Sequence, residues 1–259
     1  MQDIVVPQIF TENKCTFAPQ FALQMFQFKQ FAISQDKCGM KISSSACMLG
    51  SLAQVKQGTQ HILDIGTGTG LLALMLAQRV DCEIDAIEID AEAASQAAQN
   101  FASSPWANRL QVIEADITRW AFETAKKYDM IVCNPPFFRT ATLSLDKKRR
   151  LARHENSLEV PVLAEIAATL LAEKGDIWLL IAAESYSYYG AIFGEKGFFI
   201  CHEIALWDSP EAEKAFCYIL HFSREATEKL PEKVYFRTAK NGEYAPEYVA
   251  AMKEYLVIF

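Results

Sequence analysis

The sequence feature that most constrains the fold is a short apolar segment followed by three closely spaced glycines. Residues 62–65 have the length and composition of a buried strand, and Gly66, Gly68 and Gly70 follow at once. Glycine adopts tight bends and positive φ angles easily, so the backbone here can turn sharply and approach a ligand closely. Residues 71–79 are apolar on nearly all sides, which predicts a buried helix directly after the glycines.

Strand-like and helix-like segments continue to alternate after this unit. Because the connecting helices of such a chain cover both faces of a sheet, the order predicts an α/β fold with a mostly parallel sheet. The predicted strands are 83–89, 110–114, 129–133 and 176–183. The predicted helices are 91–101 and 162–173, and residues 116–125 are expected to form a loop and a short helix. Residues 198–207 and 215–222 are joined by a short polar loop, which favours an antiparallel pair at the sheet edge. A strand from Val234 and a helix over 246–255 complete the chain.

We expect residues 1–58 to form an N-terminal extension of the main domain, residues 59–259. Within the extension, residues 26–33 alternate between apolar and polar side chains, as in a half-buried strand, and residues 36–39 have the composition of a turn. Together these segments predict a hairpin. Residues 46–53 predict a short helix that is capped by one of the preceding serines.

The composition argues against several classes of protein. The 259 residues contain no apolar stretch long enough to cross a membrane and no basic-then-apolar leader. Seven scattered cysteines without a C-x-x-C pair favour free thiols in the cytoplasm and argue against a metal site or a disulfide framework. The net charge of −7 argues against a general nucleic-acid binder. No feature indicates an obligate protein partner.

A second motif, Asn134-Pro135-Pro136-Phe137-Phe138, lies where the predicted strand 129–133 ends. Its two prolines fix φ and remove two N–H donors, so the strand must stop there. The Asn134 side-chain carbonyl and the Pro135 backbone carbonyl can then accept both N–H hydrogens of an amine attached to a planar ring. Phe137 can stack on that ring. The nitrogen lone pair, otherwise delocalised into the ring, becomes available for attack on an electrophile.

Acidic residues follow two other predicted strands. Glu88 ends the second strand, where a carboxylate can accept hydrogen bonds from the hydroxyl groups of a ribose. The neighbouring acid, Asp90, is expected to cap the next helix. Asp116 follows the third strand, and for this residue both a capping role and a ligand contact remain open.

The two motifs resemble motifs I and IV of S-adenosyl-L-methionine-dependent methyltransferases with a Rossmann-like (class I) fold. The resemblance implies a mostly parallel seven-stranded sheet with an antiparallel edge hairpin, and S-adenosyl-L-methionine as the cofactor. It implies catalytic roles for Asn134, Pro135 and Phe137, and cofactor contacts from Asp64, Gly66, Gly68, Gly70, Glu88, Asp116, Asn134 and Lys41. Motif IV leaves the acceptor open among adenine N6, cytosine N4, guanine N2 and a glutamine amide.

Further segments resemble one bacterial family more closely. They are Phe26-x-Phe28-Lys29-Gln30-Phe31, Met40-Lys41 and Ser103-Ser104-Pro105-Trp106-Ala107. The family is that of the tRNA1(Val) (adenine-37-N6)-methyltransferases, and the resemblance runs from about Gln24 to the C-terminus. It implies methyl transfer to N6 of adenosine 37, beside the anticodon of a valine tRNA. The chain departs from the family at Ser43-Ser44-Ser45, where Gly-Thr-Asp is expected, and at Phe137, where Tyr is common.

A basic block follows the second motif. Between Arg139 and Arg153 there is one acid, Asp146, against six bases, Arg139, Lys147, Lys148, Arg149, Arg150 and Arg153. We expect this block to bind the phosphates of a tRNA anticodon loop, with a solvated run of charges as the alternative.

Two other functions stay open. One is methylation of a glutamine amide in a protein such as a release factor, although enzymes of that kind carry a helical N-terminal domain and this extension looks hairpin-like. The other is a non-catalytic RNA-binding module, against which the two intact motifs argue.

Overall fold

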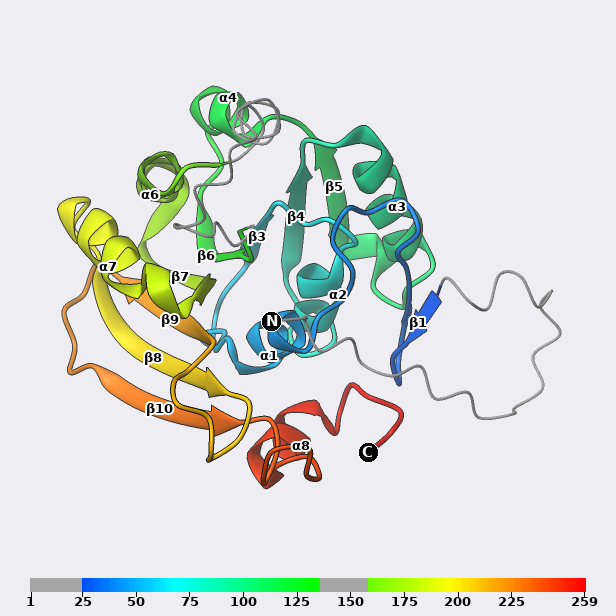
Figure 1. The fold of residues 1–259 in the computed structure, drawn as a ribbon. Coiled ribbons are helices and arrows are strands. Elements are labelled where there is room, and N and C mark those ends of the chain that lie inside the picture. Colours follow the sequence, from blue (N-terminus) through cyan, green and yellow to red (C-terminus); the bar gives the residue numbers. More distant parts are fainter. Residues whose placement is uncertain (1–24, 136–157) are drawn as a thin grey trace, which may run out of the picture.

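The computed structural model describes residues 25–135 and 158–259, which build a central sheet with helices on both faces (Figure 1). The sheet has eight strands in the order β10-β8-β9-β7-β6-β3-β4-β5. Neighbouring strands are parallel except for β9, which is antiparallel to both β7 and β8. The strands are β3 (His61–Ile65), β4 (Glu83–Glu88), β5 (Leu110–Glu114), β6 (Tyr128–Cys133), β7 (Leu171–Ala182), β8 (Phe199–Trp207), β9 (Cys217–Ser223) and β10 (Leu230–Tyr235).

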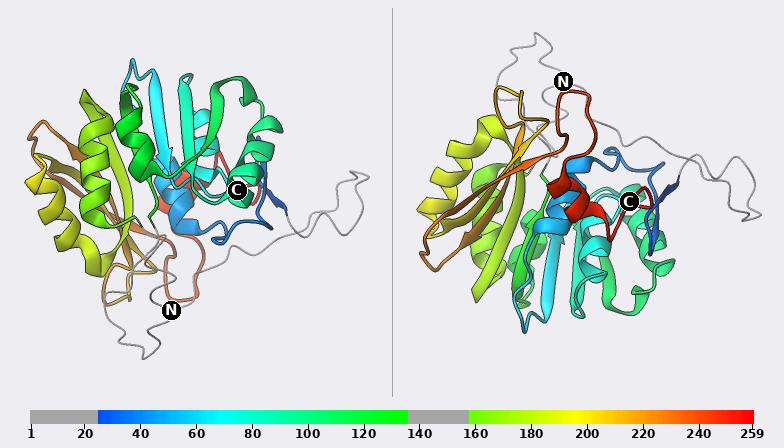
Figure 2. Two further views of the ribbon diagram at one scale, coloured as in Figure 1. Left: turned by 90° about the horizontal axis from the view of Figure 1, so that it is seen from above. Right: turned by 90° about the horizontal axis from the view of Figure 1, so that it is seen from below.

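Helices cover both faces of the sheet (Figure 2), and each face has its own apolar core. In β3, Ile62 belongs to one core, and Leu63 and Ile65 belong to the other, as expected for a strand that is buried on both faces. Helices α1 (Ser44–Leu52), α2 (Leu71–Ala77), α3 (Ala91–Ala102) and α8 (Pro246–Met252) contribute to the first core. Helices α4 (Ile117–Glu123), α6 (Val160–Leu170) and α7 (Tyr186–Glu195) contribute to the second. None of the described helices is long and apolar enough to cross a membrane.

The predicted α/β class is confirmed, but the sheet has eight strands rather than seven. β10 pairs in parallel with β8, so the antiparallel strand β9 lies inside the sheet and β10 forms its edge. The sequence prediction starts this strand only at Val234, because the preceding residues include Pro231 and two charged side chains. An edge strand accommodates such residues, since its outer backbone groups face solvent.

Two other elements differ from the prediction. α6 ends at Leu170, and Gly175 lies inside β7 instead of closing the helix. A Cβ atom on Gly175 would lie 3.0 Å from the backbone oxygen of Asp129, so the glycine lets β7 and β6 approach closely. α7 has no counterpart among the predicted helices, because its tyrosines and glycines are weak helix formers. Tertiary contacts hold it instead, including Phe193, which stacks on Phe222 of β9 at 4.6 Å.

The N-terminal hairpin forms within the segment that was predicted as a single strand. β1 (Met25–Gln27) and β2 (Ala32–Ser34) pair antiparallel, and Phe28 and Phe31 lie in the turn between them. The rings of Phe28 and Phe31 stack 4.4 Å apart, and both belong to the first core. The alternation of apolar and polar residues over 26–33 therefore comes from two short strands and the turn between them, not from one strand. The predicted turn at 36–39 belongs instead to the loop that leads to α1. The serine cap of α1 is confirmed, because Ser43 Oγ accepts a hydrogen bond from Ala46 N.

One buried amide connects the hairpin to the glycine loop. Asn100 of α3 accepts a hydrogen bond from Ser34 N at 2.9 Å and donates to the carbonyls of Ser34 at 3.0 Å and Thr69 at 2.9 Å. One turn earlier, Gln96 accepts a hydrogen bond from Lys37 N at 3.1 Å. α3 therefore fixes the position of the segment after the hairpin relative to the glycine loop.

Asn100→Ala should lower the free energy of unfolding by about 2 kcal/mol or more, because it leaves backbone groups of Ser34 and Thr69 without partners. Urea unfolding followed by circular dichroism measures the change. The matched control is Gln99→Ala, an exposed amide on the same helix, which should cost less than about 0.5 kcal/mol. Equal losses in the two variants would contradict the connecting role of Asn100.

Candidate active site

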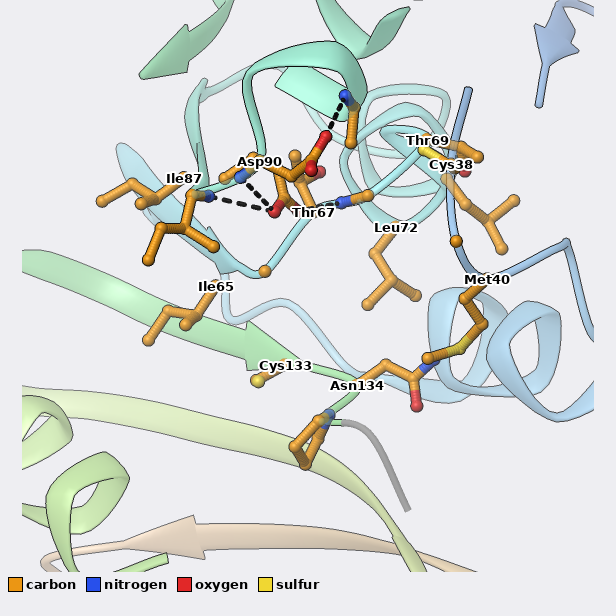
Figure 3. A pocket seen from close by; sticks show the side chains of 18 of the residues that line it. Cys38, Met40, Ile65, Thr67, Thr69, Leu72, Ile87, Asp90, Cys133 and Asn134 are labelled. Carbon is orange, nitrogen blue, oxygen red and sulfur yellow. Dashed lines mark hydrogen bonds between the residues drawn. The ribbon is translucent and has the colours of Figure 1, made fainter. Parts of the chain in front are cut away.

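A cavity of about 660 Å³ lies at the carboxyl ends of β3, β4, β5 and β6. This is the edge of a parallel sheet at which ligands bind, and the volume suits a small molecule of nucleotide size. Its wall comes from the glycine loop, the segments after β4 and β5, the end of β6 and the loop 37–42 (Figure 3). The segments that carry both sequence motifs therefore meet at one cavity.

The three glycines have two different tasks. Gly66, Gly68 and Gly70 have φ angles of 69°, 56° and 84°, which side chains disfavour. Gly66 and Gly68 line the cavity, and a Cβ atom on either would meet no atom within 4 Å. They keep this wall free for a ligand. Gly70 is not part of the wall; a Cβ there would lie 2.5 Å from the ring of Phe101, so this glycine is needed for packing.

Glu88 holds two segments of the cavity wall together. Its Oε2 accepts a hydrogen bond from Gly68 N at 2.9 Å, and its Oε1 accepts from Ile89 N and Asp90 N, both at 3.0 Å. A carboxylate has about four acceptor sites, so one remains for a ligand hydroxyl. Glu88 is half-buried and lines the cavity, and its predicted contact to a ribose stays a prediction.

Asp64 lies behind the glycine loop rather than in the cavity wall. The residue is 0% exposed, and its Oδ2 accepts a hydrogen bond from the Thr67 hydroxyl at 2.6 Å. Its Oδ1 has no hydrogen-bond partner among the described residues. Burial raises the pKa of the Asp64 carboxyl to about 7, although the bond from Thr67 opposes this shift. Asp64 thus shapes the loop through Thr67.

The other two acids begin helices. Asp90 caps α3 by accepting a hydrogen bond from Ala93 N, as predicted. Asp116 caps α4, and its Oδ1 accepts from the backbone N–H of Thr118 at 2.9 Å and from its hydroxyl at 2.7 Å. Asp116 also lines the cavity, so the capping role and a ligand contact through Oδ2 are compatible.

Asn134 and Pro135 form the wall at the end of β6. The Asn134 amide nitrogen points to the sulfur of Met40 at 3.9 Å, and the two side chains lie next to each other in Figure 3. The Asn134 Oδ1 is buried and has no hydrogen-bond partner among the described residues. Such an acceptor is costly to leave unpaired.

Most of the predicted site residues that the structure describes meet at the cavity. Gly66, Gly68, Glu88, Asp116, Asn134, Pro135 and Lys41 line it, whereas Asp64 and Gly70 do not. The Lys41 ammonium group donates a hydrogen bond to the Gln35 carbonyl, which belongs to the same connection between β2 and α1. Phe137 and the basic residues Arg139, Lys147, Lys148, Arg149, Arg150 and Arg153 lie outside the described residues.

Sequence reasoning missed several apolar residues of the wall. Ile89 is 53% exposed beside Glu88, and Cys38, Leu72 and Ile87 also line the cavity. The one available signal was the position of Ile89, directly after an acid at a strand end. Within residues 25–135 and 158–259, no group of three or more His, Cys, Asp or Glu side chains is placed to hold a metal ion.

Comparison with known proteins defines the class first. Residues 42–192 match the family described as methyltransferase small domain, so the chain belongs to this class of methyltransferases. Among solved structures, a protein of Agrobacterium tumefaciens described as a predicted O-methyltransferase has a TM-score of 0.61 and 17% identity, and the match covers 81% of this chain and 95% of that one. At this identity the likeness shows the fold alone.

Two curated relatives define the family within this class. Both carry the name tRNA1(Val) (adenine(37)-N6)-methyltransferase. The protein of Cytophaga hutchinsonii is 36% identical over 233 residues, which cover 89% of this chain and 96% of the relative. The protein of Tolumonas auensis is 38% identical over 232 residues, which cover 89% and 95%. The chain belongs to the tRNA1(Val) (adenine(37)-N6)-methyltransferase family.

The raised pKa of Asp64 predicts a pH-dependent stability. The folded protein binds a proton there up to about pH 7, whereas in the unfolded chain the ordinary pKa is 3.8. The stabilisation from this proton is therefore complete below pH 3.8 and is lost as the pH rises to about 7. Asp64→Asn should remove this part of the pH dependence, on the order of a few kcal/mol.

Urea unfolding of both proteins at several pH values measures this effect. Asp81→Asn, at an exposed surface position, is the matched control and should keep the wild-type pH profile. Parallel pH profiles for the wild type and Asp64→Asn would show that the prediction for Asp64 is wrong.

Proposed function

We propose that this protein transfers a methyl group from S-adenosyl-L-methionine to the exocyclic N6 amine of an adenosine in tRNA. The acceptor is adenosine 37, beside the anticodon of a valine tRNA. Relatives that match 89% of the chain carry this activity in their names. The observation on this chain that best supports the proposal is the buried, unpartnered Oδ1 of Asn134 in the cavity wall.

The cavity fits the proposed cofactor in size and in donor set. Gly66 and Gly68 leave room for a ligand against the loop, and Glu88 has an acceptor site left for a ribose hydroxyl. Asp116 would accept from the adenine amino group with the oxygen that does not cap α4, and Lys41 would border the site from the opposite loop. When bound, S-adenosyl-L-methionine supplies an electrophilic methyl group on a positively charged sulfur.

Asn134 and Pro135 prepare the acceptor amine. Adenine N6 is a weak nucleophile because its lone pair is delocalised into the ring. Asn134 Oδ1 and the Pro135 carbonyl accept its two N–H hydrogens, which favours a pyramidal nitrogen with a free lone pair. Pro135 belongs to a rigid turn, so the two acceptors are held in place before the base arrives. Orientation of the amine is then the main contribution of the protein to the rate.

The remaining steps need little further chemistry from the protein. The methylated amine is a strong acid and loses its proton readily, so no strong general base is required. An anticodon loop is single-stranded, and its bases can leave the stack at low cost. Phe137 is proposed to stack on the base, and the basic block from Arg139 to Arg153 to bind loop phosphates. Both lie outside the described residues and stay predictions from the sequence.

The test is methyl transfer from radiolabelled S-adenosyl-L-methionine to unmodified valine tRNA, followed by nucleoside analysis. We expect N6-methyladenosine in the wild-type transcript and none in a transcript with guanosine at position 37. Label on a release factor but not on tRNA would overturn the proposal in favour of a glutamine amide. Cofactor binding without transfer to either substrate would indicate a non-catalytic module.

Asn134→Ala should lower kcat about 10²–10³-fold, by analogy with the loss of one oriented polar group at a reacting centre. The dissociation constant for S-adenosyl-L-methionine should change less than about threefold, because the amide acts on the acceptor amine. Steady-state kinetics and calorimetric titration measure the two quantities. Asn108→Ala, an exposed amide after α3, is the control and should match the wild type. If Asn134→Ala weakened cofactor binding as much as turnover, the proposed orienting role would be wrong.

A further inference from the structure

Beyond α7, the sheet carries half-exposed aromatic side chains next to lysines. The aromatic residues are Tyr186 at the start of α7, Trp207 of β8, Tyr218 of β9 and Tyr235 of β10, and the lysines are Lys229 and Lys233. We name this set the aromatic–lysine face. It lies on the side of the sheet that faces α7, because Leu206 and Val234, which alternate with its residues, point into the opposite core.

The face has two parts that differ in charge. In the middle of the strands, the Lys229 ammonium group bonds to Glu203 at 2.9 Å, and the rings of Tyr186 and Tyr218 lie 4.9 Å apart. At the carboxyl ends, Lys233 Nζ lies 4.5 Å from the ring centre of Trp207, whose ring lies 6.3 Å from that of Tyr235. Lys233 forms no ion pair with any described residue. The carboxyl end therefore combines two rings with an unpaired positive charge.

Charge around this end is mixed. The segment 228–240 has two acids, Glu228 and Glu232, against four bases, Lys229, Lys233, Arg237 and Lys240. Neighbouring elements add acids, because Glu247 accepts a hydrogen bond from Tyr235 N and Glu211 accepts one from Lys240 N. Glu232 bonds to His202 on the other side of the sheet. On the aromatic–lysine face itself, Lys233 is the cation that remains available to an anionic group.

Edge protection explains only part of the pattern. Lysine and proline on an edge strand discourage pairing with other chains, and β10 has both Pro231 and Lys233. That role needs charges and a missing N–H group, but it does not need half-exposed aromatic rings on the flat face of the sheet. Rings with a lysine above them match the way in which single-stranded nucleic acids are bound, with bases on rings and phosphates on cations.

The position relative to the candidate active site is suitable as well. Trp207 and Tyr235 end β8 and β10, and these ends lie at the same edge of the sheet as Asn134. β8 is three strands away from β6, a lateral distance of ~14 Å at the usual strand spacing. An RNA whose target base enters the cavity would cross this edge to reach the rings, because Asn134 lies two residues after Val132 of the first core whereas the rings lie on the side of α7.

We propose that Trp207, Lys233 and Tyr235 form a second contact for single-stranded RNA of the tRNA substrate, in which a nucleotide flanking the target stacks on Trp207 and its phosphate meets Lys233. The inference rests on the proposed function. It assigns to the tRNA a path from Asn134 across the ends of β7, β9 and β8 to β10.

Binding of unmodified valine tRNA, measured by fluorescence anisotropy over a range of salt concentrations, tests the inference. Lys233→Glu and Trp207→Leu should each weaken tRNA binding about tenfold, and Lys233→Glu should also reduce the dependence on salt. Lys233→Arg and Trp207→Phe should keep the affinity within about threefold, because they retain the charge and the ring. The dissociation constant for S-adenosyl-L-methionine, measured in parallel, should stay unchanged and shows that the variants are folded.

The matched control is Lys174→Glu, an exposed charge reversal in β7 near the opposite end of the sheet, which should bind tRNA like the wild type. Wild-type affinity in both Lys233→Glu and Trp207→Leu would overturn the inference. The inference would also be overturned if these two variants lost binding to poly(Glu) but kept binding to tRNA, because the face would then be assigned to an acidic peptide. Failure of the proposed function looks different, because the wild type itself would then transfer no methyl group to tRNA.

Discussion

The hydrogen bond from Gly68 N to the Glu88 carboxylate is the interaction on which the geometry of the site depends. It joins the loop after β3 to the end of β4, and the same carboxylate also holds the next two backbone N–H groups. The loop can reach Glu88 because Gly66 and Gly68 adopt positive φ angles. A side-chain acceptor therefore sets the shape of a backbone wall, and the wall in turn sets the shape of the cavity. Charge-assisted bonds to N–H groups are among the stronger ones in proteins, and this one acts together with the bonds from Thr67 to Asp64 and from Asn100 to the Thr69 carbonyl.

The same region contains two buried oxygens that lack hydrogen-bond partners within the described residues, and the two have different consequences. Asp64 lies behind the loop, out of the cavity, and burial of its carboxyl group raises the pKa. Asn134 Oδ1 lies in the wall, where a ligand N–H group can satisfy it. An unpaired acceptor in a packed protein lowers stability, and an incoming amine removes that cost on binding.

The parts of the fold and site that follow from the sequence are those in which the backbone itself imposes a residue type. Positive φ angles require glycine at 66 and 68, two prolines end β6 after Asn134, and serine and aspartate side chains cap helices. These signals are local. The missed parts depend on tertiary contacts: α7 persists through Tyr189 and Phe193, and β10 exists because it is an edge strand. Asp64 belongs to this group as well, because motif position alone does not tell whether a side chain faces the ligand or supports a loop from behind.

The distribution of charge connects the acidic chain to an RNA substrate. The basic block from Arg139 to Arg153 and the segment 228–240 are each net positive, so the remaining residues are more acidic than the chain as a whole. In the proposed function, the basic block, which directly follows Asn134 and Pro135 in sequence, would attract phosphates of the RNA. Stacking, which tolerates any base, would contribute to affinity, while the two acceptors at the end of β6 would select for an amino group. Affinity and selectivity would then come from different residues.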